Sequence, residues 1–462
     1  MTLDLSDTRR LHIVGIGGMA MSGIATVLAR LGHQVSGSDL KSWRGLERLR
    51  LLGVDVHIPH DGASLPERLV AVVVSTAIPA SNPEVVAARE RGVPVLRRSD
   101  ALAAIVARRR TVAISGTHGK TTTSTMTTLI WRAAGWHPSF LIGGEPNEVG
   151  SNAAFDEGEW LVVEADESDG TFTEIAPEAV VLTNVEPDHL DHYGDFSALE
   201  SACARYLAAA PGPRVACADD PVAARLAAEV GGVVTYGCVP EAAYRIEGYR
   251  GMRAGSRFAL THGGGLVGEL DVSAPGLHNA RNAAGAAAVA LECGVPFEAV
   301  RTALGRFAGV ARRFQFQGEV GGVHLVDDYA HLPGEIKATL AAAAEGGWSR
   351  IVAVFQPHRY SRTARLWRDF GDAFGHADVV VLTDVYAAGE APQPGVSGRL
   401  VLRAVCEADP RRRVVYVPRR ADLTERLVAL TRPGDLVVTL GAGDVTGVGD
   451  EWIQRTCALS TA

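Results

Sequence analysis

The chain has 462 residues, of which 47% are hydrophobic and 21% charged, so we expect about three domains of ordinary size, each with its own buried core. This composition excludes a disordered or collagen-like protein. The net charge of -8 lacks the basic excess that favours binding to a phosphate backbone, and we therefore expect no nucleic-acid partner.

The cysteines and the N-terminal segment bear on the compartment. The 6 cysteines form neither a C-x-x-C pair nor a zinc-ligand spacing, which indicates a reduced, cytoplasmic chain. The first residues lack a basic segment followed by an apolar one, and no run of about 18 apolar residues occurs. We therefore expect neither secretion nor membrane insertion.

Short β-rich apolar runs alternate with alanine-rich segments of helix length. This alternation predicts α/β units with parallel sheets. The predicted strands are 12–14, 70–74, 111–114, 161–163, 179–182, 351–355, 379–382 and 436–440.

Two breaks in the pattern divide the chain. Three consecutive arginines, 108–110, precede a fresh strand. Near Gly309 an alanine-rich helical region gives way to RRFQFQGEVGGVHLVDDY. We predict domains over residues 1–108, 109–310 and 311–462.

The first glycine loop is GIGGMAMSG, residues 15–23, between a predicted strand and a helix expected over Ser22 to Arg30. Glycines let the backbone approach a diphosphate, and a helix N-terminus favours negative charge. Asp39 ends the next strand, where a ribose hydroxyl would lie. The dinucleotide fingerprint fails at its last position, Ala20, so the loop fits either a nucleotide or nucleotide-sugar site or only a tight turn.

The second glycine loop is SGTHGKTT, residues 115–122, and it resembles a P-loop. Its backbone N–H groups would hold phosphates, Lys120 would reach the β and γ oxygens, and Thr121 would bind Mg²⁺. Ile114 stands where the usual pattern has its first glycine. The strand-loop-helix context favours a P-loop over an ordinary glycine turn.

Two acidic segments follow predicted strands, EADESD at 164–169 and NVEPDH at 184–189. Ligands of open α/β sheets bind at the carboxyl ends of the strands, so both segments would face the P-loop phosphates. A carboxylate there suits Mg²⁺, whereas histidine is not the first choice for so hard a cation. Composition alone allows both segments to be solvated loops.

Taken together, the motifs resemble those of the Mur ligases of peptidoglycan synthesis, over nearly the whole chain and in the expected order. The matching segments are GIGGMAMSG, STAIP with NPE, GTHGKTT, EADESD, TNVEPDH, HNARNAAGAAAVA, RRFQ, DDYAHLPGE and FQPHRYSRT. The resemblance implies three α/β domains: a Rossmann-like N-terminal domain for the UDP-sugar, a central P-loop ATPase domain, and a Rossmann-like C-terminal domain for the amino acid.

The resemblance is strongest to the branch that adds L-alanine to UDP-N-acetylmuramate. It implies that ATP phosphorylates the sugar carboxylate, because an oxide is a poor leaving group, and that the amine of L-alanine then attacks the acyl phosphate. It further implies two Mg²⁺ ions and a cytoplasmic monomer or homodimer.

Roles for individual residues are also implied by the resemblance. The UDP-sugar site would contain Gly15, Gly17, Gly18, Met21, Ser22, Asp39 and Ser75. The ATP site would contain Gly116, Thr117, His118, Gly119, Lys120, Thr121, Thr122, Asn282, Arg313 and Asp328. The metals would be held by Thr121, Glu164 and His189.

The acceptor site and the catalytic group complete the implied assignments. Tyr329, Arg359 and Arg362 would bind the amino acid, since guanidinium forks pair with carboxylates. The catalytic residues would be Lys120, Glu164, His189 and His331. His331 would position or deprotonate the amine, and its alternative is an ordinary loop histidine.

Two departures from the family pattern stand out. The chain has DDYAHLP where members commonly have D-D-Y-G-H-H-P, so any role of the second histidine is absent. No lysine lies between Lys120 and Lys337. A carbamylated lysine in the central domain is therefore excluded, which fits the alanine-adding branch.

Other functions stay open at this point. A tripeptide-adding ligase or a folylpolyglutamate synthase belongs to the same family, although HRYSRT weighs against the first and GIGGMAMSG against the second. An NAD-dependent oxidoreductase would use the first glycine loop but leaves GTHGKTT unexplained. A nucleotide-sugar-binding protein without activity would not need Lys120, Thr121, Glu164 and His189.

Overall fold

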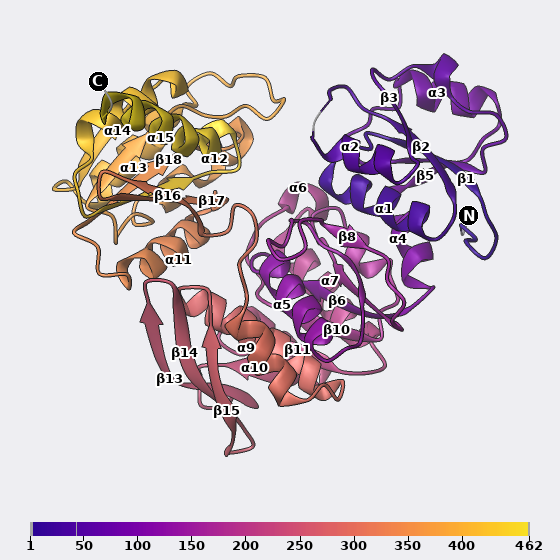
Figure 1. Cartoon of the computed structure of the whole chain (residues 1–462), viewed down its shortest axis with the longest axis horizontal. Helices are drawn as coiled ribbons and strands as arrows, with labels where there is room; N and C mark the ends of the chain where they lie inside the picture. The colour runs from indigo at the N-terminus through magenta and orange to yellow at the C-terminus, as the bar shows by residue number, and fades with distance from the viewer. Residues whose placement is uncertain (1–2, 43, 461–462) are drawn as a thin grey trace. The chain divides into compact units, whose positions relative to one another are not determined.

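The computed structural model describes residues 3–42 and 44–460, which form three sheets flanked by helices (Figure 1). Contacts divide the chain into two compact units. Unit 1 comprises residues 1–247, 259–270 and 281–307, and unit 2 comprises 248–258, 271–280 and 308–462.

The N-terminal sheet has five parallel strands in the order β3-β2-β1-β4-β5. They are β1 Arg10–Val14, β2 Gln34–Ser38, β3 Asp55–His57, β4 Ala71–Val74 and β5 Val95–Arg97. The helices are α1 Met19–Arg30, α2 Arg44–Leu51, α3 Pro83–Glu90 and α4 Arg98–Val106. The strand order reverses between β1 and β4, which is where open α/β sheets bind ligands.

The central sheet has ten strands in the order β15-β14-β13-β12-β11-β10-β6-β9-β7-β8. Its strands are β6 Arg110–Ser115, β7 Ser139–Leu141, β8 Ala153–Ala154, β9 Trp160–Glu164, β10 Ala179–Leu182, β11 Arg214–Cys217, β12 Val234–Gly237, β13 Tyr244–Met252, β14 Gly255–His262 and β15 Gly265–Val272. Its helices are α5 Lys120–Ala133, α6 Leu190–Tyr193, α7 Phe196–Ala209, α8 Pro221–Val230, α9 Leu277–Glu292 and α10 Phe297–Gly305.

The C-terminal sheet has six strands in the order β16-β17-β21-β18-β19-β20, with only the β16–β17 pair antiparallel. They are β16 Gln315–Val320, β17 Val323–Asp328, β18 Arg350–Phe355, β19 Val379–Leu382, β20 Arg413–Tyr416 and β21 Asp435–Leu440. The helices are α11 Pro333–Ala344, α12 Tyr360–Leu366, α13 Gly398–Ala408, α14 Leu423–Leu430 and α15 Gly447–Ser460.

The core strands follow from their composition. Every residue of β10 (AVVL) and β19 (VVVL) is buried, as expected for parallel strands covered by helices on both faces. Helix starts are set locally: the Asn82 side chain accepts from the Glu84 N–H at 2.9 Å, and Pro83 occupies the first turn of α3.

The eight predicted strands are all present, and the expected three-domain α/β architecture is confirmed. The helix after the first glycine loop begins at Met19, so the predicted start at Ser22 was wrong. Gly18 is extended (φ -60°, ψ 143°), and its carbonyl already accepts the N–H of Ser22. None of the helices within the described ranges is long and apolar enough to cross a membrane.

Candidate active site

Because α1 begins at Met19, the first glycine loop itself comprises residues 15–18. It connects β1 to α1 at the carboxyl edge of the N-terminal sheet. Gly15 has φ +73°, and its N–H and that of Ile16 both donate to the Ser38 carbonyl at 2.9 Å. The Asp39 carboxylate accepts the Gly17 N–H at 2.8 Å. Asp39 thus braces the loop from the neighbouring strand, while the start of α1 lies free of acidic side chains.

The other residues expected in the UDP-sugar site lie around the same edge. Ser75 directly follows β4, beside β1. The Met21 side chain is 2% exposed and belongs to the hydrophobic core, and the Ser22 hydroxyl donates to the Met19 carbonyl at 2.9 Å. Only the backbone of Met21 is therefore placed to meet a ligand.

The second glycine loop, residues 116–119, connects β6 to α5 and is braced by the end of β10. The Thr117 N–H donates to the Asn184 carbonyl at 3.1 Å, and the His118 N–H donates to the Asn184 side-chain oxygen at 2.8 Å. The Thr183 hydroxyl donates to the His118 carbonyl at 2.6 Å. These bonds fix the loop in the form that leaves the first N–H groups of α5 for phosphate.

Two glycines of this loop are required by geometry. Gly116 has φ +130°, and a Cβ there would lie 2.2 Å from the Thr183 hydroxyl. Gly119 has φ +81°, and a Cβ there would lie 2.4 Å from Oδ1 of Asn282 on α9. Asn282, expected near the adenine, therefore lies directly beside the P-loop.

Lys120 begins α5 and is held by the loop and by an acidic neighbour. Its Nζ donates to the Gly116 carbonyl at 2.6 Å and to Glu167 Oε1 at 2.9 Å. Burial acts to lower the pKa of Lys120, but the carboxylates of Glu167, Asp166 and Glu164 outweigh it and raise the pKa. Lys120 is therefore a permanent cation at the phosphate position.

Thr121 and Glu164 come together as expected. The Thr121 hydroxyl donates to Glu164 Oε1 at 3.0 Å, and the Gly143 N–H donates to Glu164 Oε2 at 2.6 Å. A Cβ on Gly143 would lie 2.7 Å from the carboxylate, so a larger residue there would displace the Glu164 side chain. The hydroxyl and the carboxylate form an oxygen-donor pair at the P-loop.

His189 lies close to two carboxylates, those of Glu167 and Asp188. Its Nε2 is 3.7 Å from Glu167 Oε1 and 3.5 Å from Asp188 Oδ2. His189 has φ +56° and immediately precedes α6. The Glu167 side chain is buried, and its Oε2 has no hydrogen-bond partner.

The donor set at the P-loop fits magnesium. Mg²⁺ is usually held by one or two carboxylates together with substrate phosphates and water, not by a complete protein cage. No group of three or more His, Cys, Asp and Glu side chains in the described part of the chain is arranged to hold a metal by itself. Thr121 and Glu164 supply the expected oxygens, and the unpartnered Glu167 Oε2 adds another.

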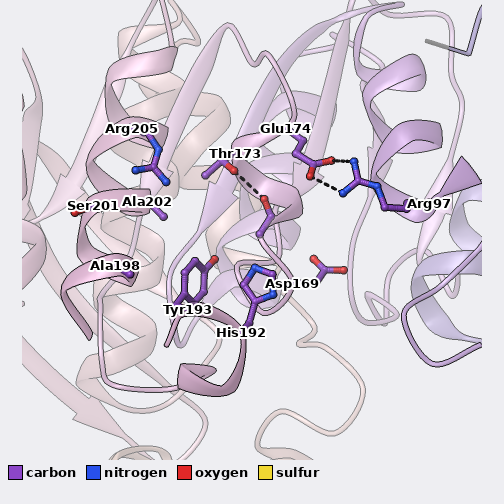
Figure 2. A pocket seen from close by; sticks show the side chains of 11 residues that line it. Arg97, Asp169, Thr173, Glu174, His192, Tyr193, Ala198, Ser201, Ala202 and Arg205 are labelled. Atoms are coloured by element: carbon purple, nitrogen blue, oxygen red, sulfur yellow. Dashed lines mark hydrogen bonds and ion pairs between the residues drawn. The ribbon is translucent and has the colours of Figure 1, made fainter. Parts of the chain in front are cut away.

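The loop that carries Glu167 is tied to α4 and α6 around a cavity of about 560 Å³ (Figure 2). Arg97 pairs with Glu174 through two hydrogen bonds of 2.9 Å, and Arg98 pairs with Asp169 at 2.8 Å. The Tyr193 hydroxyl donates to the Glu167 carbonyl at 2.5 Å. The position of Glu167 therefore depends on contacts on both sides of its loop.

In unit 2, Asp328 ends β17 and organises the segments around it. Its carboxylate accepts the N–H groups of Phe314 and Ala330, both at 2.7 Å. Burial raises the pKa of Asp328 to about 6, although Arg313 and the two N–H groups act to lower it. The Arg313 guanidinium lies 5.1 Å from the centre of the Tyr329 ring, so three residues expected at the nucleotide or amino acid meet here.

His331 follows in the same loop, and its hydrogen bonds define its tautomer. Its Nδ1 is 3.1 Å from the Tyr329 carbonyl and 3.3 Å from Glu335 Oε2, and both of these groups only accept. Nδ1 therefore carries the proton, and Nε2 keeps its lone pair. Burial lowers the pKa of His331 despite Glu335, which leaves a neutral ring able to accept a proton.

Arg359 and Arg362 lie at the start of α12, and His358 links them to His331. Arg362 Nη1 donates to His358 Nδ1 at 3.2 Å, and the His358 and His331 rings are 5.8 Å apart. Burial, His331 and Arg362 lower the pKa of His358 to about 4. Arg359 is exposed, has φ +69°, and donates its N–H to the Tyr386 carbonyl at 2.8 Å.

Sequence reasoning missed four residues of these sites. Thr183 and Asn184 brace the P-loop, Glu167 pairs with Lys120, and His358 contacts Arg362. All four lie in the quoted motifs, at or just beyond strand ends, so their position was a signal. Their partners could not be read from one sequence.

The strand, glycine loop and helix, with Lys120 at the helix start and Glu164 at the end of the adjacent strand, define a P-loop nucleotide-binding protein. The chain belongs to the Mur ligase family. Residues 10–110 match the model described as Mur ligase family, catalytic domain, residues 114–290 match the Mur ligase middle domain, and residues 312–443 match the Mur ligase, glutamate ligase domain.

Known proteins are similar over nearly the whole length. The UDP-N-acetylmuramate--L-alanine ligase of Rubrobacter xylanophilus is 48% identical over 96% of this chain and 100% of its own, and that of Pelotomaculum thermopropionicum is 45% identical over 97% of each. The solved UDP-N-acetylmuramate-alanine ligase of Thermotoga maritima has a TM-score of 0.84 and 29% identity over 97% of this chain and 99% of its own.

Proposed function

We propose that this protein ligates L-alanine to the carboxylate of UDP-N-acetylmuramate, using ATP and releasing ADP and phosphate, in the synthesis of peptidoglycan precursors. The observation that carries the proposal is the P-loop constellation of Lys120, Thr121 and Glu164 in a chain whose relatives at 45–48% identity bear the name of this activity.

The P-loop side of unit 1 performs the phosphoryl transfer. The N–H groups of residues 116–119 and of the first turn of α5, with Lys120, hold the β- and γ-phosphates and neutralise the transferring group. On reaching the nucleotide, the Lys120 ammonium exchanges a protein carboxylate for a phosphate. Thr117, His118, Thr122 and Asn282 complete the ATP site.

The metal site belongs to this proposal as well. Thr121, Glu164 and His189 would hold two Mg²⁺ ions, which would polarise the γ-phosphate and the sugar carboxylate. The buried carboxylate of Glu167 lies 3.7 Å from His189, so it would keep that imidazole oriented.

The N-terminal sheet holds the sugar nucleotide. The first glycine loop, through Gly15, Gly17 and Gly18 and the backbone of Met21 and Ser22, binds the diphosphate at the start of α1. Asp39 and Ser75 border the same edge. Separate sheets therefore serve the two nucleotides.

Unit 2 supplies the acceptor. Arg359 and Arg362 bind the carboxylate of free L-alanine, and Tyr329 borders that position. His331, with its proton on Nδ1, accepts a proton from the amine at Nε2 as the amine becomes a nucleophile. Arg313 and Asp328 contact the nucleotide from this unit.

The remaining elements of the proposal concern organisation. We place the domain boundaries at 108/109 and 310/311, and we propose a cytoplasmic monomer or homodimer. The six cysteines form no C-x-x-C pair and no zinc-ligand spacing, which supports a reducing compartment.

Phosphate release from ATP tests the proposal. We expect it to require UDP-N-acetylmuramate, L-alanine and Mg²⁺ together, with mass spectrometry detecting UDP-N-acetylmuramoyl-L-alanine. A parallel reaction offers the tripeptide L-alanyl-γ-D-glutamyl-meso-diaminopimelate in place of alanine. Hydrolysis that ignores both sugar and amino acid, or a preference for the tripeptide, would overturn the proposal.

A further inference from the structure

A buried polar cluster lies beneath the first glycine loop and has no part in the chemistry described above. We call it the Glu84 cluster: Glu84 on α3, His12 on β1, Ser38 at the end of β2, and His60 after β3. His12, Ser38 and Glu84 are each 0% exposed. Burying a carboxylate with two imidazoles is costly unless every group is paired, so this arrangement calls for a reason.

Glu84 is the centre of the cluster. Its Oε2 is 2.5 Å from the Ser38 hydroxyl and 3.5 Å from both His12 Nε2 and His60 Nδ1. Its Oε1 accepts the Asp61 N–H at 3.2 Å. Burial acts to raise the pKa of Glu84, but the neighbouring His12 imidazole and the hydrogen bond from Ser38 prevail and lower it, so the group is a carboxylate.

The directions of these hydrogen bonds follow from counting protons. A carboxylate only accepts, so the single Ser38 proton points to Glu84. The Ser38 oxygen is also 2.7 Å from His60 Nδ1, which must therefore be the donor. The hydrogen bonds from His60 to Ser38 and from Ser38 to Glu84 both run toward Glu84, and the charge of its carboxylate sets their direction.

Ser38 connects the cluster to the sugar-nucleotide loop. The Ser38 carbonyl accepts the N–H groups of Gly15 and Ile16, and the next residue, Asp39, accepts that of Gly17. Three consecutive N–H groups of the glycine loop thus depend on two residues, the first of which is held by strand pairing and by the hydrogen bond of its hydroxyl to Glu84. A shift of Ser38 would move the surface that meets the diphosphate.

We propose that Glu84 is a positioning residue for the sugar nucleotide, acting through Ser38 on the first glycine loop. The inference rests on the proposed function for the identity of the ligand. It extends that function by assigning a specific role to a fully buried side chain that does not touch the substrate.

Glu84→Gln in the full-length chain tests the inference because it keeps the size of the side chain. The new amide keeps only one acceptor oxygen, so its nitrogen must oppose either the Ser38 proton or the Asp61 N–H, and one of these hydrogen bonds is lost. We expect affinity for both UDP and UDP-N-acetylmuramate, measured by calorimetry, to fall about tenfold. Glu90→Gln, an exposed glutamate at the end of the same helix, is the matched control and should change neither value.

Kinetics separate positioning from a general loss of structure. We expect the KM for UDP-N-acetylmuramate to rise in Glu84→Gln while kcat and the KM values for ATP and L-alanine stay within about twofold, since these depend on other sheets. Unchanged UDP affinity in Glu84→Gln overturns the inference. A fall in kcat together with a rise in every KM would equally overturn it, in favour of a purely structural role.

Two further measurements keep the test decisive. If Glu84→Gln does not fold, Ser38→Ala removes the linking hydroxyl alone and should weaken UDP binding similarly. Wild-type UDP affinity in Ser38→Ala would overturn the inference. Calorimetry with UDP needs no turnover. A wild-type chain that binds UDP but does not ligate alanine would refute the proposed function while still testing the role of Glu84.

Discussion

The two glycine loops of unit 1 have the same backbone plan and different chemistry. Each follows a buried parallel strand, begins with a glycine of positive φ, and opens a helix of at least 12 residues. The first loop has no cation in its helix start, and an acidic residue of its own sheet accepts one of its N–H groups. The second begins its helix with lysine and threonine and faces three carboxylates.

This difference shows what separates holding a phosphate from transferring one. A glycine loop and helix N-terminus suffice to bind an anion. Transfer also needs a charge that neutralises the moving group and oxygen ligands for a metal. The start of α5 supplies the charge through Lys120 and the end of β9 supplies oxygen ligands through Glu164, whereas the strand end beside β1 supplies only a brace.

The largest effect should come from removing the cation. Lys120→Ala should lower kcat for phosphate release by about a thousandfold or more, since the γ-phosphate loses its neutralising charge. Calorimetry should find UDP-N-acetylmuramate affinity within about twofold of wild type. Lys337→Ala, which removes an exposed lysine, is the control. If Lys120→Ala lost UDP-N-acetylmuramate affinity as severely as it lost kcat, the two loops would not have separate functions.

The metal ligand should rank second. Glu164→Gln keeps the side chain's size, but an amide oxygen is a poorer Mg²⁺ ligand, so the Mg²⁺ concentration for half-maximal rate should rise about 10- to 100-fold. Glu159→Gln, exposed and just before the same strand, should not change it. An identical Mg²⁺ dependence in Glu164→Gln would remove this carboxylate from the metal site.

Matched glycine substitutions compare the loops directly. Gly119→Ala places a Cβ 2.4 Å from Asn282 Oδ1 and should raise the KM for ATP about tenfold. Gly15→Ala meets only the flexible end of Ile78, at 3.1 Å, and should weaken UDP-N-acetylmuramate about threefold through strain at its positive φ. Each change should spare the other nucleotide. An effect of Gly119→Ala on UDP-N-acetylmuramate, or of Gly15→Ala on ATP, would mean that the loops do not act independently.

The effect expected in unit 2 should be modest and should leave both loops working. Arg359→Lys keeps a charge but loses the planar fork, so the KM for L-alanine should rise about fivefold. Acyl-phosphate formation, trapped when alanine is withheld, should continue at the wild-type rate. Loss of the acyl phosphate with an unaltered alanine KM would assign this arginine to the nucleotide instead.

The sequence predicted the fold well where burial dominates. Runs such as AVVL and VVVL are typical of central parallel strands, and both were found with their expected limits. The strands β13–β15 were not predicted, because they are rich in glycine and charge and lack a continuous apolar run. The turn between β14 and β15, through Gly263 and Gly264 with positive φ, became clear only in the structure.

The candidate site was predictable in its motifs and not in its contacts. Lys120, Thr121 and Glu164 meet as expected because strand ends of one sheet converge. That Glu167, not Glu164, holds the lysine could not be foreseen, since both lie in one acidic segment and only the turn after β9 decides which faces inward. The direction of a hydrogen bond, as in the Glu84 cluster, likewise requires coordinates.

Arg97 at the end of β5 and Arg98 at the start of α4 give the loop that carries Glu167 an uneven sensitivity to salt. The Arg97 and Glu174 side chains are 66% and 35% exposed, so dissolved ions screen their attraction readily. Arg98 and Asp169 are each 17% exposed and are screened less. As ionic strength rises, the Glu174 end of the loop is released first, while the end nearer to Glu167 stays anchored. Lys120 therefore keeps its ion pair with Glu167 at salt concentrations that already weaken the Arg97–Glu174 pair beside the cavity.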